Sequence, residues 1–348
     1  MQKLAFVALI TLTAANVNAE EPVSWTIGER TLPVPEAASE ELQTALRNLP
    51  QPNPAQFNTQ HPKTVEEWEK ITIPHNASRS AMVKQAAPAM GVTITEHSVG
   101  NATYRKVQPK AVAGKFKNNV FIHMHSGGYT LNAGLAGTAE AVLIAARLQI
   151  PVVAIDYRMP PQNPFPAAVD DVVTIYQHVL KSHKPEEIGF GGSSAGGGLA
   201  LASIHRFKQD DIPLPAAVFA GSPWADLTKT SDSLFALEGI DRGVVTYDGV
   251  LAASASAYAD GESLTHPLIS PLYGDFADFP PVQLVTGTRD LFLGDAARTH
   301  RAMKRAGVAA ELNVYEGISH VGYLLSFTAP EAVEVFSDFG IFLTEHLQ

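Results

Sequence analysis

Cysteine is absent from the 348-residue chain. Its absence excludes disulfides, thiolate metal sites, a cysteine nucleophile and a lipid-modified N-terminal cysteine. Basic clusters are also missing: no run of Lys and Arg occurs, and the formal net charge is −10. A nucleic-acid partner is therefore not expected, because phosphate binding needs a basic surface.

Long apolar runs are scarce, and only the start of the chain carries one. Lys3 precedes an apolar stretch over residues 4–15, which is too short to span a bilayer, and small residues follow at Val17 and Ala19. This pattern predicts a cleaved signal peptide over residues 1–19; a buried helix or a membrane anchor is the alternative. The mature protein is then expected to be secreted or periplasmic, without a stable membrane span.

Strand and helix patterns alternate from about residue 92, in a chain that is 45% hydrophobic and 17% charged. An antiparallel pair is predicted at residues 92–99 and 103–107, joined by a Gly100-Asn101 turn. Further strands are predicted at 119–124, 152–155, 188–190, 217–220, 282–286 and 312–315, with helices at 136–148, 168–180, 197–207, 295–306 and 330–347. This order predicts an α/β fold with a mostly parallel central sheet covered by helices on both faces.

Two segments fall outside this alternation. Residues 20–90 are loosely patterned. Three helices are expected there: one at 40–48, a short one that begins at the capping box of Thr64 and Glu67, and one at 81–87. Residues from about 227 to 265 form a helical, small-residue insertion after a strand, which is a natural lid.

A glycine-rich turn separates the strand at 188–190 from the following helix. Gly192-Ser193-Ser194-Ala195-Gly196 fits G-x-S-x-G centred on Ser194, the pattern of a sharp turn that exposes a nucleophilic serine. Centring the pattern on Ser193 gives a poorer fit. An ordinary loop is the alternative, whereas a phosphate-binding turn lacks its expected motifs.

A serine nucleophile needs a base, and the base needs an orienting acid. Asp290 lies at the end of the strand at 282–286, and His320 follows the last predicted strand. Because parallel strands end at one edge of the sheet, Ser194, Asp290 and His320 are expected to meet there, in the order that this chemistry requires.

Acyl transfer also needs donors for a developing oxyanion. The adjacent Gly127 and Gly128 follow a predicted strand and can offer free N–H groups, and the N–H of Ala195 completes the set. His123 and His125 could suggest a metal, but no third ligand is evident, so no metal and no cofactor are expected.

Four motifs together resemble the hormone-sensitive-lipase-like branch of the α/β-hydrolase fold. His125-Ser126-Gly127-Gly128 resembles its HGGG motif and Gly192-Ser193-Ser194-Ala195-Gly196 its GDSAG motif. The sequence YRMPPQNPFPAA at 157–168 is similar to YRLAPEHPFPAA, and SPWADL at 222–227 also has a counterpart. Ser126, Ser193 and Gln162 depart from the pattern, and the two lost carboxylates are expected to alter the hydrogen bonding behind the triad.

The resemblance implies an α/β-hydrolase fold with a helical cap. It implies a triad of Ser194, Asp290 and His320, with Gly127, Gly128 and Ala195 as oxyanion donors. The expected organisation is a signal peptide at 1–19, an N-terminal cap region at 20–90, and a catalytic domain at 91–348 with the cap insertion at about 227–265.

The expected function is an exported serine carboxylesterase that acts on small-molecule esters with short-to-medium acyl chains. A lactonase or amidase with the same triad is an alternative. A ligand-binding member that has lost catalysis is another, although such members lack the histidine that this chain keeps as His320. No oligomeric state is predicted.

Overall fold

The computed structural model of the protein describes residue 28 and residues 31–348. The predicted signal peptide at 1–19 lies outside the described residues. Residues 34–348 form one compact unit, which holds all the elements discussed below. None of the described helices combines the length and apolarity needed to cross a membrane.

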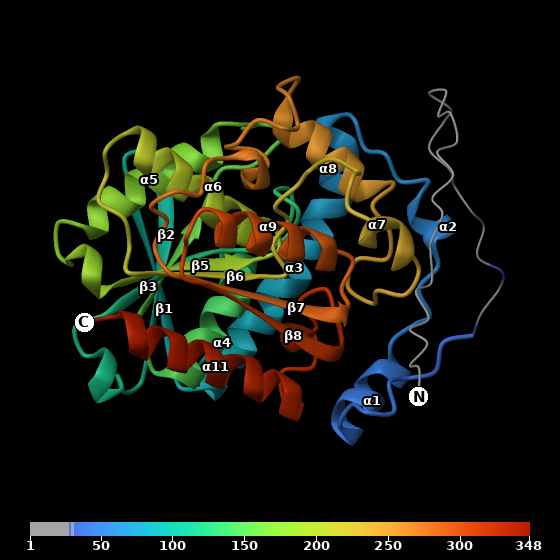
Figure 1. Ribbon diagram of the computed structural model, residues 1–348, viewed down its shortest axis with the longest axis horizontal. Helices are drawn as coiled ribbons and strands as arrows, with labels where there is room; N and C mark the ends of the chain where they lie inside the picture. The colour runs from blue at the N-terminus through green and yellow to red at the C-terminus, as the bar shows by residue number, and fades with distance from the viewer. Residues whose placement is uncertain (1–27, 29–30) are drawn as a thin grey trace, which may run out of the picture. The chain divides into compact units, whose positions relative to one another are not determined.

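An eight-stranded sheet forms the centre of this unit, in the order β1-β2-β4-β3-β5-β6-β7-β8 (Figure 1). The strands are β1 (Val92–Val99), β2 (Ala102–Pro109), β3 (Val120–Met124), β4 (Val152–Asp156), β5 (Ile188–Ser193), β6 (Ala217–Gly221), β7 (Val282–Arg289) and β8 (Ala310–Ser319). β1 pairs antiparallel with β2 and β2 with β4, and all later pairs are parallel. The predicted mostly parallel sheet is confirmed, with strand ends displaced by a few residues at most.

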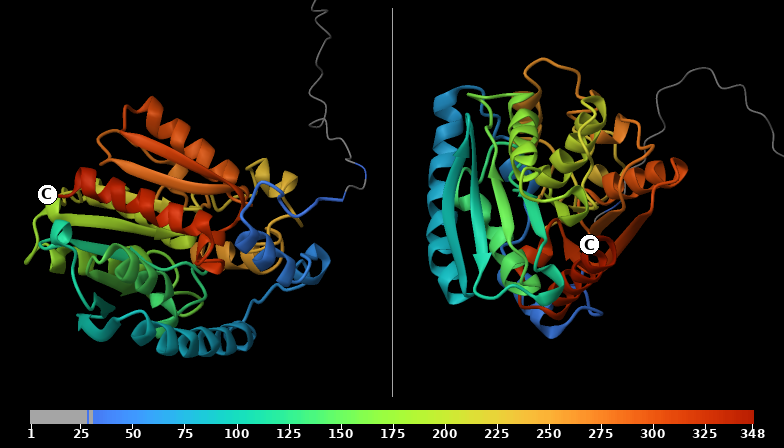
Figure 2. Two further views of the ribbon diagram at one scale, coloured as in Figure 1. Left: turned by 90° about the horizontal axis from the view of Figure 1, so that it is seen from below. Right: turned by 90° about the vertical axis from the view of Figure 1, so that its left-hand side faces the viewer.

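Helices cover both faces of the sheet, as predicted (Figures 1 and 2). The longer helices are α1 (Glu40–Asn48), α3 (Val65–Ala89), α4 (Ala139–Leu148), α5 (Ala167–Val179), α6 (Ala195–Gln209), α8 (Val250–Ala259), α9 (Leu293–Arg305) and α11 (Pro330–His346). Single turns form α2 (Pro54–Phe57), α7 (Ser233–Ala236) and α10 (Gly322–Leu325).

Alternation along the buried strands separates the core into two apolar layers. In β3, Ile122 and Met124 belong to the layer that includes α5 and α6, whereas Phe121 belongs to the layer with α4 and α11 on the other face. α1 and α3 join the second layer through Leu42 and Val83. Both faces of β3 are therefore buried, which explains why its sequence is apolar except at His123.

The N-terminal segment differs from the prediction in its helices: α2 was not predicted, and α3 is longer than expected. α1 spans the predicted residues, and Thr64 and Glu67 form the predicted capping box, but a single helix of 25 residues replaces the two helices expected near 64 and 81–87. Pro74 lies inside this helix. Proline removes one helical hydrogen bond at a cost of about 3 kcal/mol. Burial of Trp68, Val83 and Ala87 outweighs this cost.

The N-terminal segment and the insertion after β6 pack against each other. The carbonyl oxygen of Phe57 lies so close to Gly249 that a Cβ there would stand 2.0 Å from it, and a Cβ at Gly239 would stand 3.2 Å from Pro54 Cγ. Figure 1 shows α2 beside α7 and α8. The division into a cap and a catalytic domain at residue 90 remains a prediction, because residues 34–348 form one compact unit.

Candidate active site

The turn between β5 and α6 holds Ser194 in a strained conformation, with φ 57° and ψ −124°. On either side of it, a Cβ at Gly192 or at Gly196 would stand 2.0 Å from the carbonyl oxygen of Met124 at the end of β3. No side chain fits at that distance. The glycines therefore allow the turn to pack directly against β3, and this packing presents Ser194 at the carboxyl edge of the sheet.

The structure brings the three predicted residues into one hydrogen-bonded chain. Ser194 Oγ lies 2.8 Å from His320 Nε2, and His320 Nδ1 lies 3.0 Å from Asp290 Oδ1. The three side chains come from the ends of β5, β7 and β8 and are nearly inaccessible, with exposures of 7% for Ser194, 3% for His320 and 0% for Asp290. The Phe292 ring packs edge-on against His320, with centroids 4.7 Å apart.

The charges of Asp290 and His320 support each other. Burial by itself would raise the pKa of Asp290, but the His320 charge and hydrogen bond hold that pKa below its ordinary value. Burial would likewise lower the pKa of His320, and the Asp290 carboxylate raises it above its ordinary value instead. Thr286 Oγ1 and the N–H of Phe292 also donate to Asp290, at 2.8 and 2.9 Å. These contacts favour an ionised Asp290 and fix the orientation of the imidazole.

The predicted donor groups lie on two turns next to Ser194. Gly127 and Gly128 have φ values of 122° and 60°, which glycine adopts readily. Ala195 is the first residue of α6, where helical N–H groups have no partner in the helix. Within the described part of the chain, none of these three N–H groups donates to an acceptor. They are therefore available to bind an oxyanion.

The side chain of Ser193 points toward α4 and takes part in a different hydrogen-bond network from that of Ser194. Its hydroxyl donates to Glu140 of α4 and lies 2.6 Å from Tyr323 Oη, while Glu140 also contacts His123 Nε2 at 3.0 Å. Ser193 stands where the GDSAG motif has an aspartate, but Glu140 of α4 supplies a carboxylate behind the turn. This network binds His123, and His125 Nδ1 instead contacts the Ser126 carbonyl oxygen at 2.8 Å. Among residues 28 and 31–348, no set of His, Asp and Glu side chains is grouped to hold a metal.

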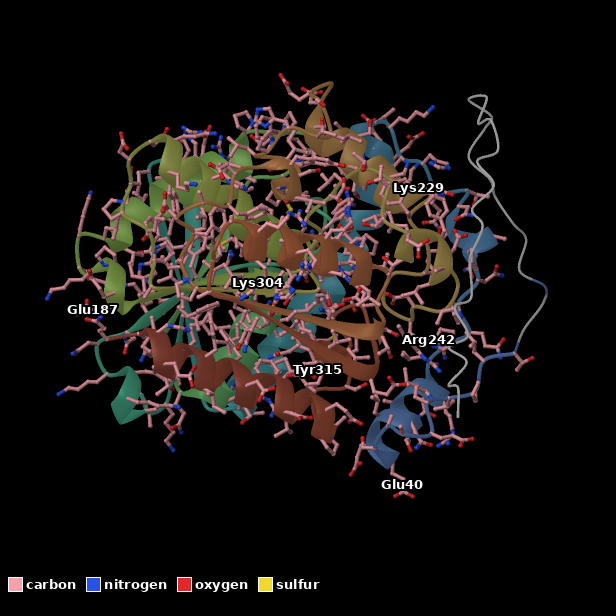
Figure 3. All side chains as sticks on the ribbon, viewed as in Figure 1. Glu40, Glu187, Lys229, Arg242, Lys304 and Tyr315 are labelled. Carbon is pink, nitrogen blue, oxygen red and sulfur yellow. The ribbon has the colours of Figure 1, made fainter. Side chains whose placement is uncertain are left out.

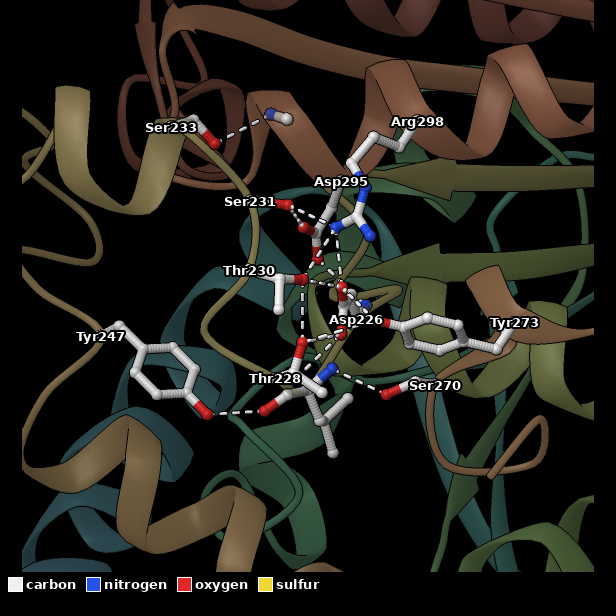
Figure 4. A network of polar contacts seen from close by, with 12 residues as sticks. Asp226, Thr228, Thr230, Ser231, Ser233, Tyr247, Ser270, Tyr273, Asp295 and Arg298 are labelled. Carbon is white, nitrogen blue, oxygen red and sulfur yellow. Dashed lines mark hydrogen bonds and ion pairs between the residues drawn. The ribbon is translucent and has the colours of Figure 1, made fainter. Parts of the chain in front are cut away.

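A second buried acidic pair, Asp226 and Asp295, lies where the start of the insertion meets α9 (Figure 4). Asp295 accepts from Ser231 and from the N–H of Asp226, and burial raises its pKa to about 7. Asp226 accepts from Arg298 at 2.7 Å and from Thr230 at 2.8 Å. These bonds attach the start of the insertion to α9. The carboxylate of Asp295 accepts its hydrogen bonds within this network and not from His320.

Two residues near the site were not predicted from the sequence. Glu140 lies within an amphipathic helix, where a single acidic residue gives no signal of burial. Asp241 lies in the insertion, is fully buried, and accepts hydrogen bonds from the N–H groups of Leu291 and His320. Only the tertiary fold brings either carboxylate to the site.

Comparison with known proteins identifies the family. The model of the family described as alpha/beta hydrolase fold matches residues 121–324. An acetyl-hydrolase of Streptomyces hygroscopicus is 30% identical over 247 residues, covering 71% of this chain and 81% of the relative.

Solved structures agree with this family. The crystal structure of esterase E25 has a TM-score of 0.91 and 42% identity, and covers 93% of this chain and 99% of its own. An esterase from the bacterial hormone-sensitive lipase family has a TM-score of 0.75 and 27% identity, over 90% of this chain and 100% of its own. The chain belongs to the α/β-hydrolase fold family, and within it to the hormone-sensitive-lipase-like hydrolases of carboxylic esters.

Proposed function

We propose that this protein is a serine carboxylesterase in which Ser194, His320 and Asp290 are the catalytic triad. The hydrogen-bonded chain from Ser194 Oγ through His320 to Asp290, with its distances of 2.8 and 3.0 Å, is the observation that carries the proposal. The three unpaired N–H groups beside Ser194 provide the second requirement of acyl transfer, because they can stabilise a tetrahedral oxyanion.

In this proposal each group has one step in the reaction. Ser194 Oγ attacks the ester carbonyl while His320 Nε2 accepts its proton, and Asp290 stabilises the imidazolium that forms. The N–H groups of Gly127, Gly128 and Ala195 bind the oxyanion. His320 then protonates the leaving alcohol, and a water molecule hydrolyses the acyl-enzyme by the same route.

Short-to-medium acyl chains are the proposed substrates, because α8 lies directly over the oxyanion turn. Tyr129 stacks on Tyr258 of α8 with centroids 3.8 Å apart, and Thr130 Oγ1 lies 3.1 Å from Ser254 Oγ. A Cβ on Gly128 would stand 3.8 Å from Leu251 Cδ1. This side chain therefore limits the space beside the oxyanion, and Leu251→Ala should raise kcat/KM for octanoate esters relative to acetate esters. An unchanged ratio would contradict this assignment of the wall.

Export is proposed from the sequence of the first residues alone. N-terminal sequencing of material recovered outside the cytoplasm should begin at Glu20. Active cytoplasmic protein that retains Met1 would contradict it.

Hydrolysis of p-nitrophenyl acetate tests the function itself. The wild-type protein should turn over, and Ser194→Ala should lose nearly all of the activity, whereas the matched variant Ser193→Ala should retain much of it. Absence of turnover by the wild-type protein on a panel of esters, lactones and amides would favour a ligand-binding role instead.

A further inference from the structure

The insertion approaches the triad through one fully buried carboxylate, that of Asp241. Its two oxygens accept from four backbone N–H groups: Leu291 at 2.6 Å, Gly243 at 2.7 Å, Val244 at 3.0 Å and His320 at 3.1 Å. Two of these donors belong to the insertion, and the other two belong to His320 itself and to the residue after Asp290. A carboxylate accepts several such bonds well only when it is ionised.

The neighbours of Asp241 hold the same segment in place. The N–H of Arg242 lies 3.2 Å from Ser319 Oγ, and a Cβ at Gly243 would stand 2.5 Å from the carbonyl oxygen of His320. Residues 241–243 therefore lie flush against residues 319 and 320.

The guanidinium of Arg242 extends the contact to the N-terminal segment. It donates to the carbonyl oxygens of Leu46 and Leu49 at the C-terminus of α1, at 2.8 Å each (Figure 3). Helix C-termini leave such carbonyl groups unpaired, so a cation there is favourable. The segment at 241–243 is thus attached to α1 on one side and to the triad on the other.

We propose that Asp241 is a positioning residue for the esterase reaction, which holds the backbone of His320 and the turn after Asp290 in register with Ser194. This inference rests on the proposed triad. Without the carboxylate, the turns that carry the base and the acid lose a shared acceptor, and two buried N–H groups lose their partner. Displacement of reacting groups by about 1 Å can lower a rate by about 100-fold.

The charge of Asp241 acts on His320 as well. Burial and the nearby Asp290 raise the pKa of Asp241 to about 6, and the Asp241 charge in turn helps to raise the pKa of His320. Asp295 on α9 acts on His320 in the same direction, and the positive charge of Arg242 is directed to α1. Removal of the Asp241 charge should therefore make the base protonate at lower pH.

The test is Asp241→Asn, measured as kcat, KM and the pH profile of kcat/KM. Asparagine keeps the shape but directs an NH₂ group at N–H donors. We expect kcat to fall by about 10- to 100-fold with little change in KM, and the acid limb of the profile to move to lower pH. Asp232→Asn, an exposed carboxylate of the same insertion, should leave all three quantities unchanged.

A folded Asp241→Asn enzyme with wild-type kcat and an unmoved acid limb would overturn the proposal. If that variant does not fold, Gly243→Ala gives the answer, because its methyl group presses on the carbonyl oxygen of His320. It should lower kcat about 10-fold or more, and an unchanged kcat would overturn the proposal equally. His320→Ala, measured in parallel, distinguishes failure of this proposal from failure of the proposed triad. Full activity of His320→Ala would reject the triad, and with it the proposed function.

Discussion

Gly196→Ala provides a sharp test of why the serine turn has its sequence. The added Cβ would stand 2.0 Å from the Met124 carbonyl oxygen, whereas ordinary contacts begin near 3.4 Å. The obstructing atoms are backbone atoms of Met124 and His125, which cannot rotate away as a side chain can. The turn or the end of β3 must therefore move by more than about 1 Å. Overpacking of this kind costs about 1–3 kcal/mol, and the better helix propensity of alanine returns at most about 1 kcal/mol.

The displacement also reaches the proposed oxyanion donors, because Met124 directly precedes the turn with Gly127 and Gly128. With the full offset, we therefore expect a net loss of up to about 2 kcal/mol in unfolding free energy, together with a fall in kcat of up to about 100-fold. The matched control is Gly114→Ala, where a Cβ has no atom within 4 Å. Urea denaturation and ester hydrolysis measure both effects. A Gly196→Ala enzyme as stable and active as Gly114→Ala would refute the reasoning.

The remaining predictions concern charge and the residue next to the nucleophile. Because the Asp290 carboxylate raises the pKa of His320 and the base must be neutral, the acid limb of kcat/KM should lie above pH 6.5; a limb below that value would contradict the pairing. Asp290→Asn should move the limb to lower pH and reduce kcat by up to about 10,000-fold, and a variant that retains wild-type kcat would exclude this acid. Ser193→Ala should cost about 1–3 kcal/mol of unfolding free energy, because Glu140 and Tyr323 each lose a buried partner; equal stability in urea denaturation would contradict that.

The sheet and the chain of three residues could be predicted because their signals are local. Runs of β-branched residues mark the buried strands, and G-x-S-x-G marks a turn whose glycines the backbone needs. Asp290 and His320 were predictable from their order and their places after strands. The oxyanion donors and the lid insertion were also predicted from local patterns, and the resemblance to a known family implied the same assignments.

Other features depend on tertiary contacts and could not be predicted in this way. The sequence predicted two separate helices near residues 64 and 81–87, but packing of Trp68 and Val83 accompanies one continuous helix, α3. Glu140 contacts Ser193 across 53 positions of sequence, and Asp241 contacts His320 across 79. Neither carboxylate has a local pattern, because the donors that it meets are brought together only by the fold.

The most direct measurement of the central claim is the site of covalent labelling by an alkyl p-nitrophenyl phosphonate. The reagent should inactivate the wild-type enzyme with a stoichiometry of one, and peptide mass spectrometry should place the adduct on Ser194. The Ser193→Ala variant should be labelled at the same residue, because Ser194 Oγ alone of the two hydroxyls lies next to His320 Nε2. An adduct on Ser193, or covalent labelling that persists in Ser194→Ala, would contradict the account.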